Sequence, residues 1–172
     1  MILKQRGDWD NASRILLQLT RFNPSCAECY FHLGEIEESK LDFTKAVTYY
    51  TKAAIYDPVY YFNLGLNYQT VGNLKASINA FQNYHQSFPM SLEGMIALGI
   101  SYRKSGDIIK GEEIFKSVLY LSPDNPAAHF NLSLIYIESG RKNEALFHIE
   151  TYRRITGTKW MPYNIKKVFN EK

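Results

Sequence analysis

The chain has 172 residues, of which 45% are hydrophobic and 22% charged, as is typical of soluble globular proteins. Its formal net charge of +3 is too small to indicate nucleic-acid binding. No apolar run approaches the roughly 18 residues that a membrane-spanning helix needs. We therefore expect a soluble, cytoplasmic protein that neither enters a membrane nor binds nucleic acid.

One pattern of residues recurs along the chain at a spacing of 34. It combines a Leu, a small residue and a Tyr: Leu64, Gly65 and Tyr68, then Leu98, Gly99 and Tyr102, then Leu132, Ser133 and Tyr136. A period of this length is typical of helix–turn–helix repeats.

Apolar periodicity and turn residues predict helices throughout. A lone helix is expected at residues 8–22, followed by helix pairs and a short last helix. The pairs are 26–39 with 42–56, 59–71 with 74–87, 92–105 with 108–121, and 126–139 with 142–156; the last helix is 162–170. Because the loops between them are short, consecutive helices should lie antiparallel and adjacent.

Glycine and proline punctuate this pattern. Gly72, Gly106 and Gly140 follow first helices, where a left-handed residue ends a helix. Proline closes each unit, at Pro24, Pro58, Pro89 and Pro123.

The pattern resembles the tetratricopeptide repeat family over about residues 7–157. The residues that carry the resemblance are Tyr30, Leu33, Gly34, Ala46, Tyr50, Ala53, Pro58, Tyr61, Leu64, Gly65, Tyr68, Phe81, Pro89, Leu98, Gly99, Tyr102, Phe115, Pro123, Leu132, Tyr136, Ala145 and Ile149. Small residues such as Gly34 and Ala46 would let neighbouring helices approach closely.

The resemblance implies an all-α fold, a right-handed superhelical solenoid of antiparallel helix pairs. The array would span 1–157, as a partial repeat at 1–25 and four full repeats at about 26–58, 59–91, 92–125 and 126–157, before a C-terminal capping helix and tail at 158–172. Two features depart from the family pattern. The step from Gly34 to Gly65 is 31 residues, and Gly111 stands where Ala is usual.

In this family the first helix of each pair lines a concave groove. Carried over position by position, the groove residues are Phe31, Glu35, Phe62, Asn63, Leu66, Ile96, Ile100, Arg103, Phe130, Asn131 and Leu134. These residues predict binding of an apolar or amphipathic segment of a partner protein, as a scaffold or assembly chaperone. Two alternatives stay open. Some apolar members could pack between helix pairs, and Asn63 and Asn131 could hydrogen-bond neighbouring helices instead of a partner.

Cys26 and Cys29, followed by His32, suggest a different function. A Cys-x-x-Cys pair at a helix N-terminus is a place where a thiolate is stabilised. No βαβ pattern or second cysteine pair accompanies it, so two small residues at the start of a packed helix are the simpler interpretation. A redox- or metal-responsive protein using this pair is the alternative function.

No catalytic site is expected, and no cofactor or bound metal. His85, His129 and His148 have no Ser, Cys or carboxylate partner at a useful spacing, and no phosphate-binding loop occurs. The end of the chain, 162–170, should cap the last repeat. Alternatively, it would swap into a neighbouring copy and form a homodimer.

Overall fold

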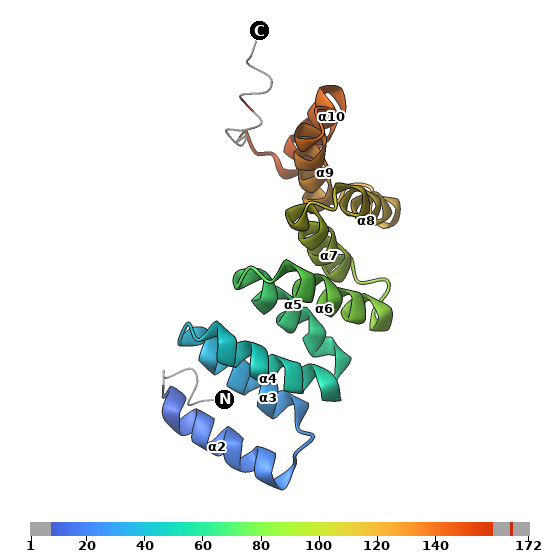
Figure 1. The fold of residues 1–172 in the computed structure, drawn as a ribbon. Coiled ribbons are helices and arrows are strands. Elements are labelled where there is room, and N and C mark those ends of the chain that lie inside the picture. Colours follow the sequence, from blue (N-terminus) through green and yellow to red (C-terminus); the bar gives the residue numbers. More distant parts are fainter. Residues whose placement is uncertain (1–7, 160–165, 167–172) are drawn as a thin grey trace. The chain divides into compact units, whose positions relative to one another are not determined.

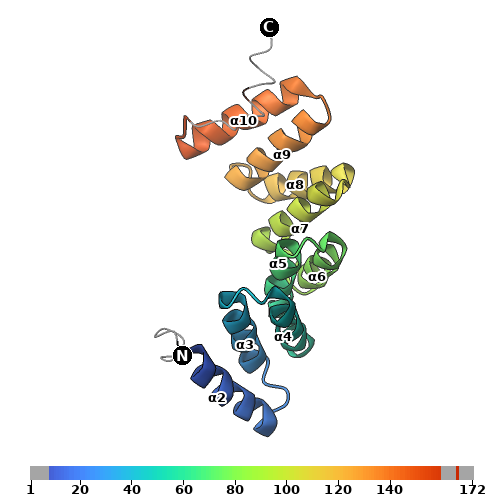
Figure 2. The same cartoon turned by 60° about the vertical axis from the view of Figure 1, so that its left-hand side comes forward.

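The computed structural model describes residues 8–159 and Lys166. Over these residues the regular structure is helical (Figures 1 and 2). The α-helices are α2 (Trp9–Phe22), α3 (Ala27–Ser39), α4 (Phe43–Tyr56), α5 (Tyr61–Thr70), α6 (Leu74–Ser87), α7 (Leu92–Ser105), α8 (Ile108–Leu121), α9 (Pro126–Glu138) and α10 (Lys142–Thr156). The predicted capping helix at 162–170 falls outside the described residues.

The chain divides into two compact units, residues 1–90 and 91–172. In the first unit α3 packs on α4 and α5 on α6, while α4 also contacts α5 and α2 lies against α3. In the second unit α7 packs on α8 and α9 on α10, and α8 contacts α9. The predicted all-α fold of antiparallel helix pairs is therefore confirmed.

Short polar side chains fix where most helices begin. In six of the described helices an Asp, Asn or Ser accepts a hydrogen bond from the backbone N–H three residues ahead, which satisfies one of the free donors of the first turn. These caps are Asp8, Asp42, Asn73, Ser91, Asp107 and Asn125. The caps explain why the helix starts were predictable from sequence.

Left-handed residues end the first helices, as predicted for the glycines. Gly72, Gly106 and Gly140 have φ angles of 76°, 87° and 71°. The turn between α3 and α4 uses Leu41 instead, with φ of 62°. A side chain makes this conformation costly, so the first pair lacks the permissive residue that the others have.

A glycine of each first helix receives a ring of the second helix. A Cβ atom added to the glycine would lie less than 3 Å from that ring, at 2.6 Å for Gly34 and Tyr50, 2.6 Å for Gly65 and Phe81, and 2.8 Å for Gly99 and Phe115. These three rings are at most 1% exposed. The predicted close approach at these glycines is confirmed, and it sets the distance between the two helices.

Each unit has its own hydrophobic core. In the first unit the cluster includes Ala46, Tyr50, Ala54, Leu64 and Ala80. In the second it comprises Met95, Phe115, Val118, Ala128, Leu132, Ile135, Tyr136 and Ala145.

The shortened repeat step at Pro58 produces a local change. Residues Pro58–Tyr60 form one turn of 3₁₀ helix, and the side chain of Asp57 accepts the N–H of Val59 at 3.0 Å. α5 therefore begins at Tyr61 rather than at residue 59, because proline and this Asp cap set a tighter turn before the helix.

Gly99 packs against a ring, whereas Gly111 has room for a methyl group, so substitution by alanine should have opposite effects at the two positions. Gly99→Ala should lower the free energy of unfolding by about 1–3 kcal/mol, because its Cβ would enter the Phe115 ring. Gly111→Ala should raise it by up to about 1 kcal/mol, because a Cβ there meets its neighbours at 3.4 Å and alanine favours the helix. Urea denaturation followed by circular dichroism measures both. A change of the same sign in the two variants would contradict these opposite roles.

Asn67 is a buried polar side chain whose amide atoms lack hydrogen-bond partners among the described residues. It is 1% exposed in α5, and neither its amide oxygen nor its nitrogen has a hydrogen-bond partner in the protein. The residue two repeats later, Ile135, is fully buried and apolar.

We expect Asn67→Leu, which keeps the shape, to raise the free energy of unfolding by about 1–3 kcal/mol, because an unsatisfied buried amide is removed. Asn83→Leu, at an exposed position of α6, is the control and should change it by less than about 0.5 kcal/mol. A gain no larger than that of the control would mean that the Asn67 amide is satisfied in solution.

Candidate partner-binding faces

The candidate site consists of the first-helix faces, one in each unit. The first-unit face is carried by α3 and α5, and the second-unit face by α7 and α9. On each helix two candidate residues stand three before and one after the glycine or serine that packs on the second helix. The other candidates, Asn63 and Asn131, stand two before it, and Arg103 stands four after it. The residues three before it are Phe31, Phe62, Ile96 and Phe130, and all four are half-buried.

In the first unit the aromatic members rest partly on other rings. The Phe31 ring stacks on Tyr60 with centroids 4.7 Å apart, and it lies 5.9 Å from Tyr50. Phe62 meets Phe81 edge-on at 5.8 Å. These contacts hold the rings in place, so part of each ring packs against neighbouring aromatic side chains.

Leu66, one residue after Gly65, is the most open apolar member of the first-unit face. It is 40% exposed, whereas Phe31 and Phe62 are only partly accessible. Asn63 is also half-buried. This face therefore offers one aliphatic anchor beside two rings of fixed orientation.

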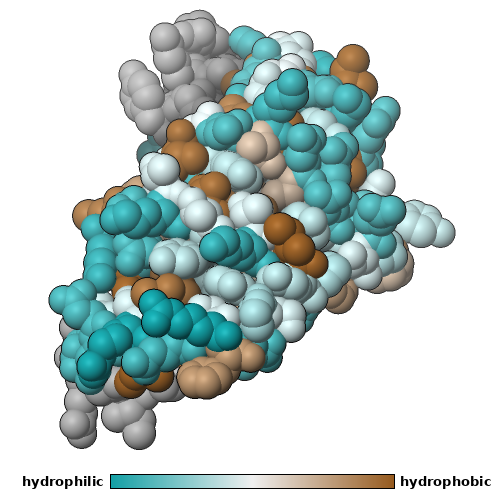
Figure 3. All heavy atoms as spheres, turned by 60° about the horizontal axis from the view of Figure 1, so that its bottom comes forward, coloured by the Kyte–Doolittle hydropathy of each residue, from teal (hydrophilic) through white to brown (hydrophobic). Residues whose placement is uncertain are grey.

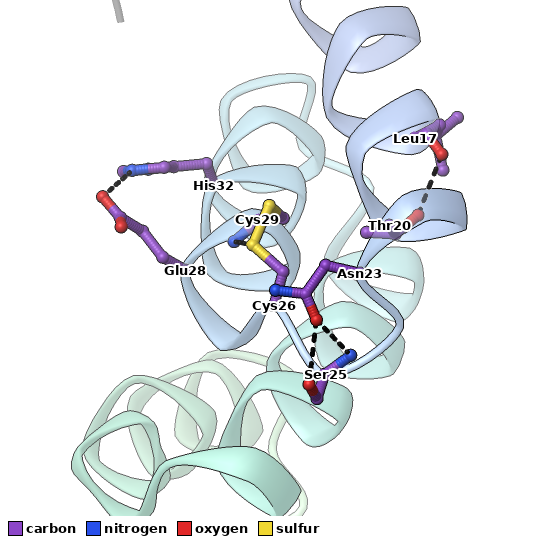
Figure 4. The surroundings of a disulfide bond; sticks show 8 residues. All are labelled: Leu17, Thr20, Asn23, Ser25, Cys26, Glu28, Cys29 and His32. Carbon is purple, nitrogen blue, oxygen red and sulfur yellow. Dashed lines mark hydrogen bonds and ion pairs between the residues drawn. A yellow bond between two sulfur atoms is a disulfide. The ribbon is translucent and has the colours of Figure 1, made fainter.

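An acidic group lies at the α3 end of this face. His32 Nδ1 lies 2.7 Å from Glu35 Oε2. On its other side His32 Nε2 lies 3.4 Å from Glu28 Oε1, a contact drawn in Figure 4. The Tyr50 hydroxyl donates to Glu38 at 2.6 Å, and burial together with that carboxylate raises the pKa of Tyr50. Burial, followed by the Glu28 charge, also raises the pKa of Tyr60.

The second-unit face is aliphatic with one aromatic ring. Ile96 and Ile100 pack against the core cluster of this unit, and Leu134 is half-buried. The Phe130 ring lies 5.3 Å from Tyr152 of α10. As in the first unit, second-helix rings support the first-helix residues.

Arg103, one of the predicted groove residues, is held in an ion pair. Its Nη1 lies 2.8 Å from Glu138 Oε1, so the pair links α7 to α9. The side chain is 18% exposed. Sequence alone could not show this ion pair, because the two residues are 35 positions apart and meet only when the helices pack.

The Asn131 side chain forms a hydrogen bond within its own helix, α9. It is 6% exposed, and its amide nitrogen donates to the backbone oxygen of Ala127 at 2.8 Å. Its donor is therefore satisfied within its own helix.

Cys26 and Cys29 are joined in a disulfide, with their Cα atoms 5.3 Å apart (Figure 4). Cys26 caps α3, and its sulfur accepts the N–H of Cys29 at 3.2 Å. His32 points to carboxylates rather than to sulfur. Among the residues that the structure describes, no group of three His, Cys, Asp or Glu side chains could hold a metal ion.

Exposed apolar side chains elsewhere are scattered. On the face drawn in Figure 3, hydrophobic residues stand as small separate patches within a hydrophilic surround. Two of the exposed apolar residues, Ile55 of α4 at 66% and Ile109 of α8 at 73%, lie on second helices. They provide controls for changes on the first-helix faces.

A histidine pair that sequence reasoning missed joins α9 and α10, with His129 buried and His148 half-buried. His129 Nδ1 lies 2.8 Å from His148 Nδ1, and His129 Nε2 lies 2.9 Å from the oxygen of Pro123. Because that oxygen only accepts, His129 donates from Nε2, and its Nδ1 accepts from His148. Residues 19 apart on successive helices carry no sequence signal of such a contact.

The histidine pair predicts acid sensitivity in the second unit. Burial, followed by the nearby His129, lowers the pKa of His148 to about 4. Since the unfolded value is about 6.5, the fold favours neutral His148, and stability falls as the pH drops from about 6.5 towards 4. His148→Gln should flatten this fall.

Amide hydrogen exchange of residues 126–156 at pH 7 and pH 4.5 measures the effect. His85→Gln, in the first unit, is the control and should leave the fall unchanged. Equal loss of protection in the wild type and His148→Gln would count against the pair.

The structure defines a protein built from antiparallel helical repeats. The family model for the tetratricopeptide repeat matches residues 2–60 and 96–155, more than half of the chain. The chain therefore belongs to the tetratricopeptide repeat family, whose members generally act as non-enzymatic interaction scaffolds.

A curated relative is "Protein CTR9 homolog" of Arabidopsis thaliana, 29% identical over 130 residues. The match covers 72% of this chain but only 12% of that protein.

Solved structures share the fold. MamA matches with a TM-score of 0.80 and 20% identity, over 90% of this chain and 92% of that one. YrrB, described as a tetratricopeptide repeat protein with an unusual peptide-binding site, matches with a TM-score of 0.79 and 16% identity, over 92% of this chain and 83% of that one.

Within the described residues, no helix is long and apolar enough to cross a membrane.

Proposed function

We propose that the first-helix faces bind an apolar or amphipathic segment of a partner protein, and that the protein acts without catalysis as a scaffold or assembly chaperone. The observation that carries the proposal is the set of incompletely covered apolar side chains at equivalent positions of the first helices. Leu66, Ile100 and Leu134 follow the packing glycine or serine, and Leu66 is 40% exposed.

Rigid support of these side chains favours binding. Phe31, Phe62 and Phe130 are held by rings of Tyr60, Phe81 and Tyr152 respectively. Little rotamer freedom is then lost when a partner covers them, which reduces the entropic cost of association. Full burial of an exposed apolar side chain contributes roughly 1.5–3 kcal/mol and micromolar binding needs about 8 kcal/mol, so several of these half-buried anchors must act together.

Charge indicates which segment would suit the first-unit face. Glu28 and Glu35 make its α3 end acidic, with His32 between them. A segment with apolar residues and a basic end would be oriented by these carboxylates, which act on the rate and direction of association more than on its strength. The similar fold of YrrB, a protein described as having a peptide-binding site, supports the proposal.

Homodimerisation through the C-terminal helix stays a separate proposal, because residues 160–165 and 167–172 lie outside the described part of the chain. Sedimentation equilibrium with and without residues 160–172 would test it.

The test of the proposed function is a pull-down from a native extract with Leu66→Glu and, separately, Leu134→Glu. A partner retained by the wild type should be lost or bound at least about tenfold more weakly, because a charge would enter an apolar contact. Ile55→Glu and Ile109→Glu, on second helices, should retain it. Equal retention by the face variants, with helical content intact, would refute binding at these faces.

A further inference from the structure

The disulfide at the start of α3 is poorly placed to act as a structural staple. It joins residues only three apart, within the first turn of one helix and its cap. A disulfide stabilises chiefly by closing a loop in the unfolded chain, and the effect grows with loop length. This one encloses two residues, Ala27 and Glu28, and ties no helix to another.

The two sulfur-bearing residues differ in access. Cys29 is 7% exposed, whereas Cys26, at the cap, is half-buried. The turn that leads to Cys26, residues 22–25, is exposed throughout. Phe22, at the end of α2, is 90% exposed. Cys26 is therefore the more accessible of the two cysteines to an approaching thiol.

The local structure also stabilises a sulfur anion. The N–H of Cys29 points to the Cys26 sulfur at 3.2 Å, and both residues lie at the positive end of the 13-residue helix α3. The nearby Glu28 is turned toward His32, on the side of α3 opposite to α2 (Figure 4). Glu28 is the one carboxylate that stands between the two cysteines in sequence, and its Oε1 lies 3.4 Å from His32 Nε2.

We propose that Cys26 and Cys29 form a thiol–disulfide exchange site that oxidises dithiols. A thiolate of the dithiol attacks Cys26 Sγ, the Cys26–Cys29 bond breaks, and Cys29 leaves as a thiolate and takes up a proton. The second thiolate of the dithiol then attacks its own sulfur in the mixed disulfide and releases Cys26. The dithiol loses two electrons and two protons, and the cysteine pair gains both.

This site is independent of the first-helix faces in its chemistry. The reduced pair still caps α3, because the Cys26 sulfur continues to accept the Cys29 N–H, so the fold should survive reduction. An exchange site must be reduced without unfolding of the protein, whereas a structural disulfide need not be.

The first experiment measures the rate of reduction of the full chain by dithiothreitol at pH 7, using thiol alkylation and mass spectrometry. We expect the folded protein to react about tenfold faster than the urea-unfolded chain, because both sulfurs lie at the positive end of α3, which stabilises the thiolates that reduction produces. Circular dichroism should show unchanged helical content after reduction. Slower reduction in the folded state, or loss of helix on reduction, would overturn the proposal and leave a structural bridge.

The second experiment identifies the reacting sulfur with a matched pair of variants. Cys29→Ser leaves Cys26, and Cys26→Ser leaves Cys29. With oxidised glutathione, Cys26 should form a mixed disulfide at least about tenfold faster than Cys29, in line with its exposure. A faster reaction at Cys29, or equal rates, would contradict the assignment. The binding variants Leu66→Glu and Leu134→Glu should exchange at the wild-type rate, which separates this site from the proposed partner binding.

Discussion

The contact between a first-helix glycine and a second-helix ring is the constraint on which the helix pairs depend. With no Cβ on Gly34, Gly65 or Gly99, the ring lies directly on the helix backbone, and the two helices are held at one distance. The ring is removed from water almost completely, and as a large aromatic side chain it buries more apolar area than the alanines around it. The last pair solves the same problem differently, with Ser133 and Ile149, both fully buried.

This constraint also determines which side chains remain outside the core. Once the glycine side of a first helix faces its partner helix, the residues three before and one after it must lie at the edge of the contact. Phe31, Phe62 and Phe130 are there, each supported by a second-helix or turn ring. The partner-binding faces thus follow from the packing: the second helices fill the interior and at the same time fix the orientation of the residues that a partner would meet.

The helices could be predicted from sequence because their signals are local: a 34-residue period, polar caps and glycine ends. The Leu41 turn could not, since the sequence there offers no residue suited to φ of 62°. Contacts between residues far apart in the sequence could not be predicted either. The ion pair of Arg103 with Glu138 forms only because α7 and α9 pack together, and the contact of His129 with His148 forms only because α9 and α10 do. The Cys-x-x-Cys motif was visible, but the bond between its sulfurs was not.

Site-specific photocrosslinking tests most directly whether the first-helix faces bind a partner. A photoreactive amino acid at position 66, on the first-unit face, would be compared with the same amino acid at position 55, on α4, in a native extract. We expect a discrete partner adduct from position 66 and none from position 55. An adduct from position 55 alone would contradict partner binding at the first-helix faces.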